Sequence, residues 1–251
     1  MGELTDRVVV VTGGSRGIGR ALVDGFAAAG AHVVVASRKL DACRAVAEHV
    51  AAQHGVRALP VAFHAARWED CDRLADAVEA EFGRCDVLVN NAGMSPPYPS
   101  LGAIDESYFD KVLGVNLKGP FRLSVRLAEQ MVAGDGGSII NVSTIGSLRP
   151  GADELVYACA KAGLNALTVG LAEAYAPSVR VNALLPGPVD TDIAAGWSPE
   201  MREGAIARVP LGRMGVADDY VGPALWLATS ASAFVTGTLI RVDGGTYRQM
   251  S

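Results

Sequence analysis

The sequence has few of the residues that build disulfide frameworks or zinc sites. It contains four cysteines and four histidines in 251 residues. No two cysteines have the C-x-x-C spacing, and no histidine pair completes a zinc pattern. The sequence is therefore neither that of a disulfide-rich secreted protein nor that of a zinc module. We expect the cysteines to be reduced and to act as small buried apolar residues.

The chain also lacks an excess of positive charge and a long apolar run. Lys and Arg number 22 against 27 Asp and Glu, which gives a net charge of −5. This balance offers no electrostatic footprint for nucleic acid or for an anionic membrane surface. No uninterrupted apolar stretch approaches the length of a membrane-spanning helix, and the N-terminal residues do not resemble a signal peptide. We therefore expect a cytoplasmic protein with no nucleic-acid or membrane partner.

Short β-branched runs alternate with longer helical patterns along the whole chain. Strands are predicted at 7–11, 32–36, 56–62, 86–90, 137–143, 178–185 and 237–243. Helices are predicted at 17–29, 40–53, 69–82, 105–132, 155–175 and 218–229. The strands are apolar on both faces, as in a parallel sheet covered by helices on both sides. The sequence thus predicts an α/β fold: one doubly wound, Rossmann-like domain, residues 1–251, with a seven-stranded parallel sheet.

One segment interrupts this alternation. Residues 190–215 are rich in Gly and Pro and carry an isolated Trp. A long insertion of this kind between regular elements is a common form for the lid of an active site. We therefore predict a mobile substrate lid at about 190–215.

A glycine-rich stretch follows the first predicted strand and opens the first predicted helix. It reads TGGSRGIG at 12–19. Gly13 permits a tight turn, whereas Gly17 and Gly19 allow close approach of the backbone and close helix packing. The helix N-terminus then offers free N–H groups to a pyrophosphate. This context predicts a dinucleotide-binding loop, to which Ser15 and Ile18 also belong.

The end of the second strand bears on which nicotinamide cofactor is bound. An NAD-selecting site has an acidic residue there that accepts from the ribose 2′-hydroxyl. This chain has Ser37 and Arg38 instead, and Arg16 lies inside the glycine loop. A hydroxyl and two guanidiniums suit a 2′-phosphate, which Arg can bind in bidentate fashion. We predict NADP(H), with NAD(H) as the runner-up.

Seven motifs follow one another in a fixed order. They are TGGSRGIG at 12–19, NNAG at 90–93, VNLKG at 115–119, NVST at 141–144, YACAK at 157–161, LPGPVDT at 185–191 and VDGG at 242–245. In these motifs the chain resembles the short-chain dehydrogenase/reductase superfamily, in its single-domain form, over essentially its whole length. Within that superfamily, the chain resembles the branch that contains the 3-oxoacyl-(acyl-carrier-protein) reductases.

The resemblance implies further cofactor-binding residues. Asn90, Ala92 and Gly93 would line the adenosine side and hold the central sheet. Those at the nicotinamide and phosphates would be Pro186, Gly187, Val189 and Thr191. The family has an acidic residue followed by a hydrophobic one near the adenine, where this chain has His64 and Ala65. This departure leaves open whether His64 bonds the adenine or is an ordinary surface residue.

Tyr157 and Lys161 are the candidate proton-transfer pair. Their i, i+4 spacing puts them on one face of a helix. A tyrosine with a pKa of about 10 is a poor base at neutral pH, and an adjacent ammonium favours its phenolate. The resemblance implies that Lys161 also holds the ribose hydroxyls, and that Asn116 completes a proton relay through water to Lys161.

A hydroxyl at the end of the fifth strand is expected to donate to the substrate carbonyl. The resembling family has serine thirteen residues before the tyrosine, where this chain has Thr144. Ser143 precedes it, and neighbouring strand residues point to opposite faces. We therefore favour Thr144 and keep Ser143 as the alternative, with Ser147 or no hydroxyl as the remaining readings.

The predicted activity is reversible hydride transfer between the nicotinamide and a carbonyl or secondary alcohol, with Tyr157 as general acid/base. A non-catalytic NADP(H)-binding sensor on the same fold is the alternative. We expect a small-molecule substrate. An acyl-carrier-protein thioester is also considered, because Arg122, Arg126 and Arg149 could contribute a basic patch. The family resemblance and apolar edges of the predicted last strand and helices indicate a homotetramer.

Overall fold

The computed structural model describes residues 2–190 and 198–247, and in them seven strands form one parallel sheet. The order is β3-β2-β1-β4-β5-β6-β7, and each neighbouring pair is parallel. The predicted fold class is confirmed. The strands are β1 (Val8–Thr12), β2 (His32–Ser37), β3 (Ala58–Ala62), β4 (Val87–Asn90), β5 (Gly137–Val142), β6 (Val179–Pro186) and β7 (Leu239–Val242).

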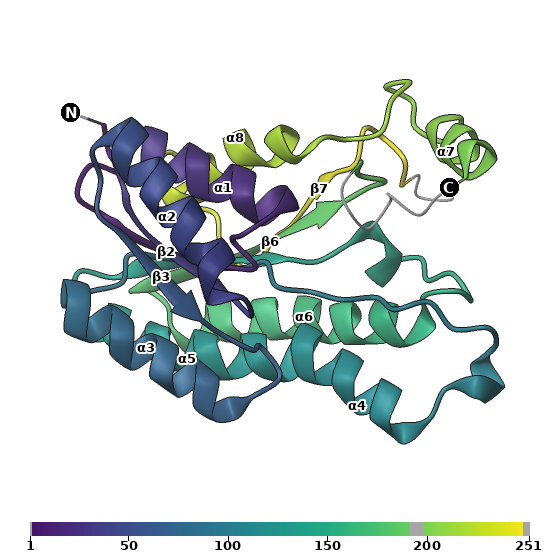
Figure 1. Cartoon of the computed structure of the whole chain (residues 1–251), viewed down its shortest axis with the longest axis horizontal. Coiled ribbons are helices and arrows are strands. Elements are labelled where there is room, and N and C mark those ends of the chain that lie inside the picture. Colours follow the sequence, from purple (N-terminus) through teal and green to yellow (C-terminus); the bar gives the residue numbers. More distant parts are fainter. Residues whose placement is uncertain (1, 191–197, 248–251) are drawn as a thin grey trace.

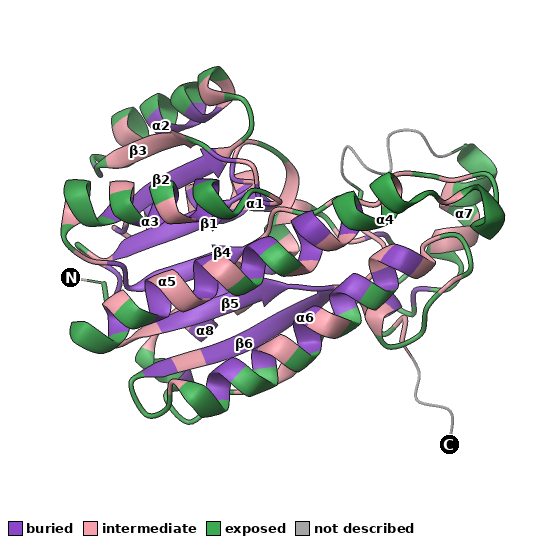
Figure 2. Ribbon diagram, turned by 90° about the horizontal axis from the view of Figure 1, so that it is seen from below, coloured by how far each residue is buried: buried purple, intermediate pink, exposed green. Residues whose placement is uncertain are grey.

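Helices cover both faces of this sheet. They are α1 (Gly17–Ala28), α2 (Leu40–His54), α3 (Trp68–Phe82), α4 (Glu106–Leu113), α5 (Gly119–Ala133), α6 (Leu155–Ala174), α7 (Pro199–Ile206) and α8 (Val221–Ala228). Figure 1 shows α1, α2 and α8 on one face and α3, α5 and α6 on the other. Two apolar cores result, one beneath each helical layer. The buried strands between them are visible in Figure 2. Burial on both faces explains why the strands lack polar alternation.

The helix predicted at 105–132 differs from the structure. It is divided into α4, a π-helical turn at Gly114–Lys118, and α5. Glycine is required where α5 begins, because a Cβ on Gly119 would collide with the carbonyl oxygen of Ala65. A π-turn inserts an extra residue into a helix and frequently occurs at functional sites. Here the turn contains Asn116.

Helix α6 is apolar along its 20 residues and meets the length and composition of a membrane span. Half of its most apolar window is nevertheless buried inside the protein, where the helix packs against β6. That is the pattern of a core helix, which passes the same test. The helix also carries Tyr157 and Lys161.

The four cysteines are free, as predicted, but their burial differs. Cys43, Cys71 and Cys85 are buried, and burial raises the pKa of the Cys71 thiol to about 12. Cys159 is exposed, which corrects the expectation that all four are core residues. It lies on the outer face of α6, between the buried residues Ala158 and Ala160. A helix with one face turned to solvent exposes some of its small residues.

The order of the strands determines where a site can form. β1 lies between β2 and β4. The chain adds β2 and β3 on one side of β1, and then adds β4 to β7 on the other side. In open α/β sheets such a switch point opens a crevice at the carboxyl ends of the strands. The loops that follow β1, β2, β4, β5 and β6 meet at this edge, and they carry the sequence motifs.

Candidate functional site

The glycine loop forms a tight turn between β1 and α1. Gly13 has φ of +68°, and its N–H donates to the carbonyl oxygen of Ala36 at 2.7 Å. A Cβ at Gly13 would lie 2.8 Å from Asn91 Nδ2, and one at Gly19 would collide with the carbonyl oxygen of Gly13. Arg16, the N-cap residue of α1, places no side-chain cap on the helix. The first N–H groups of α1 are therefore available to a phosphate, as in a dinucleotide cradle.

Thr12 fastens the NNAG loop to the glycine loop. Its Oγ1 accepts from the N–H groups of Asn91 and Ala92, each at 3.0 Å. Asn91 Nδ2 donates back to the carbonyl oxygen of Thr12 at 2.9 Å. Neither residue is among the predicted site residues, although Thr12 directly precedes the glycines and Asn91 stands within NNAG. Together they hold Ala92 beside the cradle.

Asn90 has a different environment from the one predicted. Its Nδ2 is buried and donates to Ser124 Oγ and to Asn141 Oδ1, each at 2.9 Å. The side chain therefore joins β4 to α5 and β5. This agrees with the expectation that Asn90 holds the central sheet. It does not face the crevice, because these partners lie in the interior.

Two arginines stand on the neighbouring loops after β1 and β2. Arg16 and Arg38 are both exposed, and Thr12 is paired with Ala36 where the two strands end. Arg38 makes no ion pair within the part of the chain that the structure describes. Ser37 is partly engaged, with its Oγ 3.0 Å from Cys43 Sγ. No acidic residue stands at 37 or 38 to accept from a ribose 2′-hydroxyl.

His64 and Ala65 close a turn after β3. The His64 N–H donates to Asp70 Oδ2 at 2.9 Å, and its Nδ1 accepts from the N–H of Ala66 at 3.3 Å. Ala65 is buried where α5 begins, against Gly119. Since Nδ1 is used as an acceptor inside the turn, only Nε2 of His64 remains for a ligand.

Tyr157 and Lys161 lie on one face of α6. Lys161 Nζ is 5.7 Å from the centroid of the Tyr157 ring and donates to the carbonyl oxygen of Val142 at 2.7 Å. Burial lowers the pKa of Lys161 to about 7. Burial, together with the Glu154 carboxylate, raises the pKa of Tyr157 above its ordinary value. Burial and the Glu154 carboxylate both favour the protonated phenol, so a phenolate requires positive charge nearby, which the Lys161 ammonium can supply.

Asn116 and Gly93 lie next to Lys161. The Asn116 amide donates to the carbonyl oxygens of Met94 and Val112 at 2.8 and 2.9 Å, and Oδ1 accepts from the Met94 N–H at 3.2 Å. A Cβ at Gly93 would lie 3.1 Å from Asn116 Oδ1 and 3.6 Å from Lys161 Nζ. The absence of a side chain at Gly93 therefore leaves space between these groups. The water relay itself stays a prediction.

The two candidate hydroxyls point to different surroundings. Ser143 is buried, and its Oγ lies 3.4 Å from the carbonyl oxygen of Lys161 and 3.5 Å from Ser147 Oγ. Thr144 is half-buried, and its Oγ1 accepts from the Gly146 N–H at 3.1 Å. This bond leaves the hydroxyl proton of Thr144 free to be donated. The geometry therefore agrees with the preference for Thr144, and its catalytic role stays a prediction.

The end of β6 forms the last part of the crevice. Pro186 pairs with Val242, and the Gly187 N–H donates to the carbonyl oxygen of Val242 at 3.2 Å. A Cβ at Gly187 would lie 2.8 Å from Asp243 Cα. Val189 makes a parallel bridge with Gly215, which closes the base of the predicted lid. Thr191 lies outside the described residues, and the described part of the lid segment includes α7.

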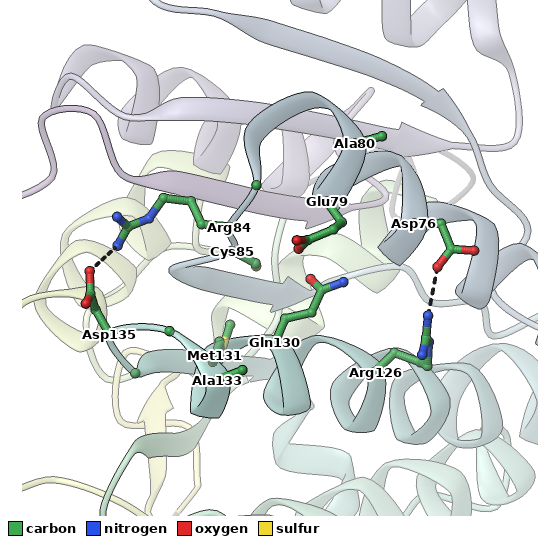
Figure 3. A pocket seen from close by; sticks show the side chains of 13 residues that line it. Asp76, Glu79, Ala80, Arg84, Cys85, Arg126, Gln130, Met131, Ala133 and Asp135 are labelled. Atoms are coloured by element: carbon green, nitrogen blue, oxygen red, sulfur yellow. Dashed lines mark hydrogen bonds and ion pairs between the residues drawn. The ribbon is translucent and has the colours of Figure 1, made fainter.

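A separate pocket lies at the opposite edge of the sheet, between α3 and α5 (Figure 3). It is lined by residues that precede β4 and β5, so it lies at the amino ends of the strands. Its two arginines are paired: Arg84 with Asp135 at 3.2 Å and Arg126 with Asp76 at 2.7 Å. None of the predicted catalytic or cofactor-binding residues lines it.

Comparisons with known proteins show the family of the chain. A family model described as enoyl-(acyl carrier protein) reductase matches residues 13–247. The L-rhamnose 1-dehydrogenase (NAD(P)(+)) of Azotobacter vinelandii is 42% identical over 252 residues, covering 97% of this chain and 98% of the relative. The 3-oxoacyl-(acyl-carrier-protein) reductase of Aquifex aeolicus is 32% identical, covering 98% and 99%.

Solved structures give the same result. A Beutenbergia cavernae protein described as an NAD(P)-dependent gluconate 5-dehydrogenase, with NADP bound at low occupancy, superposes with a TM-score of 0.92. It is 36% identical, and the match covers 97% of this chain and 98% of that one. The ordered motifs, the sheet and these full-length matches show that the chain belongs to the short-chain dehydrogenase/reductase superfamily.

Proposed function

We propose that the protein is an NADP(H)-dependent oxidoreductase that interconverts a secondary alcohol or hemiacetal and the corresponding carbonyl compound. The observation that carries the proposal is the position of Tyr157 beside Lys161 on α6, a helix that packs against the turn after β5 that begins at Thr144. When bound, the nicotinamide accepts or supplies the hydride. The chain's own residues have to bind the substrate oxygen and move its proton.

Tyr157 is the proposed general acid/base. In alcohol oxidation its phenolate takes the hydroxyl proton, and in reduction its phenol returns that proton to the carbonyl oxygen. The Thr144 hydroxyl donates to the same oxygen and stabilises the charge that develops on it. Lys161, held by the Val142 carbonyl, supplies the positive charge that opposes the raised pKa of Tyr157. Asn116 fixes the loop that follows β4 beside this pair.

NADP(H) is the proposed cofactor, and NAD(H) is the alternative. The uncapped start of α1 supports a dinucleotide cradle, and the turn before it is tight, because a Cβ at Gly13 or Gly19 would collide with backbone or with Asn91. The 2′-phosphate would lie between the loops that carry Arg16 and Arg38. Arg binds phosphate through paired N–H groups, which supports NADP(H) over NAD(H).

The proposed substrate is a small polyhydroxylated molecule. The relatives described as acting on L-rhamnose and on gluconate support this class. An acyl-carrier-protein thioester has weaker support, because two arginines of the predicted basic patch are neutralised on this chain. Arg122 pairs with Asp72 and Arg126 with Asp76, each at 2.7 Å.

We also propose a cytoplasmic homotetramer whose single domain has a substrate lid at 190–215. Large apolar side chains are exposed on α5, α6, α8 and the segment before β7: Phe121, Val169, Trp226 and Phe234. Apolar groups in such positions are typical of subunit contacts. Sedimentation of the purified protein tests this, and a monomer at working concentration would refute it.

The test of the activity is initial-rate kinetics on a substrate panel, with NADP(H) and NAD(H) compared. The panel contains aldoses, gluconate, cyclohexanol, a small diketone and an acetoacetyl thioester. We expect turnover with NADP(H) that Tyr157→Phe abolishes without weakening NADPH binding. Tight NADPH binding with no turnover across the panel would refute the enzymatic proposal and favour a cofactor sensor.

A further inference from the structure

Glu154 is an acidic residue beside the proposed catalytic groups that the mechanism does not use. Glu154 is the N-cap residue of α6 and lies three residues before Tyr157, at the start of the helix that carries Tyr157 and Lys161. Its carboxylate reaches the turn after β5, where a Cβ at Gly146 would collide with Glu154 Oε1. Gly146 in turn donates its N–H to Thr144 Oγ1. The carboxylate therefore lies between the turn of Thr144 and the helix face of Tyr157.

Glu154 has no cationic partner at this position. It forms no ion pair within residues 2–190 and 198–247, although it is half-buried. Burial and the neighbouring Asp153 raise its pKa, which one hydrogen bond from the Gly151 backbone only partly opposes. The carboxylate also raises the pKa of Tyr157, so it disfavours the phenolate that alcohol oxidation needs. A carboxylate placed here retains acceptor capacity for a ligand's hydroxyl groups and repels anions.

Tyr98 holds the segment that carries Glu154. Its hydroxyl donates to the carbonyl oxygen of Ala152 at 2.6 Å and accepts from the Leu155 N–H at 2.9 Å. These two bonds lie on either side of Glu154 in the chain. The Tyr98 ring packs edge-on against Tyr108, with centroids 5.7 Å apart. The loop after β4 thus fixes the start of α6 and the position of the Glu154 backbone.

We propose that Glu154 determines substrate specificity by accepting a hydrogen bond from a hydroxyl on the carbon next to the reacting carbon, and that Tyr98 positions it. This inference rests on the proposed function and narrows its substrate class to uncharged aldoses and polyols. An anionic substrate would be repelled by the carboxylate, and a substrate with no neighbouring hydroxyl would gain nothing from it. Hydrogen bonds to charged groups are among the stronger ones in proteins, so the effect is measurable.

The test compares variants on matched substrates with NADP⁺. The substrates are L-rhamnose, D-galactose and D-glucose, their 2-deoxy counterparts, and cyclohexanol. The variants are Glu154→Gln, Glu154→Leu and the control Asp153→Asn, which removes an exposed carboxylate one residue away. We expect both Glu154 variants to lower kcat/KM for the preferred aldose by about 10- to 100-fold and to change the 2-deoxy sugar and cyclohexanol by less than about threefold. Asp153→Asn leaves all of them unchanged.

The pH profile separates a binding role from a structural one. Removal of the negative charge in Glu154→Gln should shift the rise of kcat/KM for cyclohexanol oxidation to lower pH, because the Tyr157 phenolate becomes easier to form. Tyr98→Phe should weaken aldose use in the same direction as Glu154→Gln, with the 2-deoxy sugar again less affected. A purely structural contact would lower the rates on all substrates alike.

Failure of this inference is distinguishable from failure of the proposed function. If wild type oxidises aldose and 2-deoxy sugar with equal efficiency, or if the Glu154 variants lose both equally, the specificity role is overturned while the oxidoreductase remains. The same holds if only an acetoacetyl thioester or gluconate is turned over. If the wild-type protein binds NADPH and turns over nothing, both proposals are overturned.

Discussion

Replacement of the Thr144 hydroxyl tests which group polarises the substrate oxygen. Thr144→Val removes the hydroxyl and keeps the branched shape, whereas Thr144→Ser keeps the hydroxyl. Thr144 Oγ1 already accepts from the Gly146 N–H at 3.1 Å, so its proton is the group left for the substrate. Ser143 is instead buried and directed toward the carbonyl oxygen of Lys161.

The expected magnitudes follow from these contacts. Loss of one preorganised donor to a developing oxyanion lowers kcat by about 10²- to 10³-fold, or about 2.7–4 kcal/mol. Thr144→Val also leaves the buried Gly146 N–H without its acceptor, which costs about 1–3 kcal/mol of unfolding free energy. Ser143→Ala removes only long contacts of 3.4 and 3.5 Å. Its effect should be about 1 kcal/mol or less on stability and less than about threefold on kcat.

The assay is steady-state kcat on the best substrate of the panel, with urea unfolding measured on the same preparations. Thr144→Ser should retain most of the activity, which shows that the hydroxyl matters and not the methyl group. The reasoning is refuted if Thr144→Val stays active while folded Ser143→Ala loses activity by two orders of magnitude. In that case the strand end must rotate on ligand binding so that Ser143 faces the crevice.

Three other predictions concern the cofactor site and the buried lysine. Arg38→Asp should lower kcat/KM for NADP⁺ by about 10- to 100-fold and raise the relative use of NAD⁺, measured by comparing both cofactors. Gly19→Ala should abolish NADPH binding in a fluorescence titration of folded protein, because its Cβ collides with the Gly13 carbonyl oxygen; retained affinity would contradict the cradle. The pKa of Lys161 is about 7 in the folded protein and about 10.5 unfolded, so the unfolded chain binds the extra proton between these values. Stability of wild type relative to Lys161→Met should therefore rise from pH 7 to pH 9 in urea unfolding, and a falling difference would contradict the burial of the ammonium.

Local sequence patterns were sufficient to predict the architecture. A parallel sheet that is buried on both faces requires apolar strands that alternate with amphipathic helices. The hydrophobic pattern of each segment alone is enough to recognise such a strand or helix. The glycine loop and the i, i+4 pair of Tyr157 and Lys161 were equally accessible, since each depends on residues close together in the chain. The helix predicted at 105–132 missed the π-helical turn at Gly114–Lys118, because the packing there, such as that of Gly119 against Ala65, involves a residue distant in sequence.

The sequence by itself therefore determined the fold class and the superfamily, and it predicted the cradle and the proposed catalytic pair. Only the tertiary structure decided which neighbouring groups surround them. It buried Ser143 and Asn90, joined Thr12 to the NNAG loop, and placed the Glu154 carboxylate against the turn of Thr144. These outcomes depend on contacts between loops that meet at one sheet edge but lie tens of residues apart. Side-chain direction, burial and pKa at that edge are properties of the packed loops, so no local pattern in the chain encodes them.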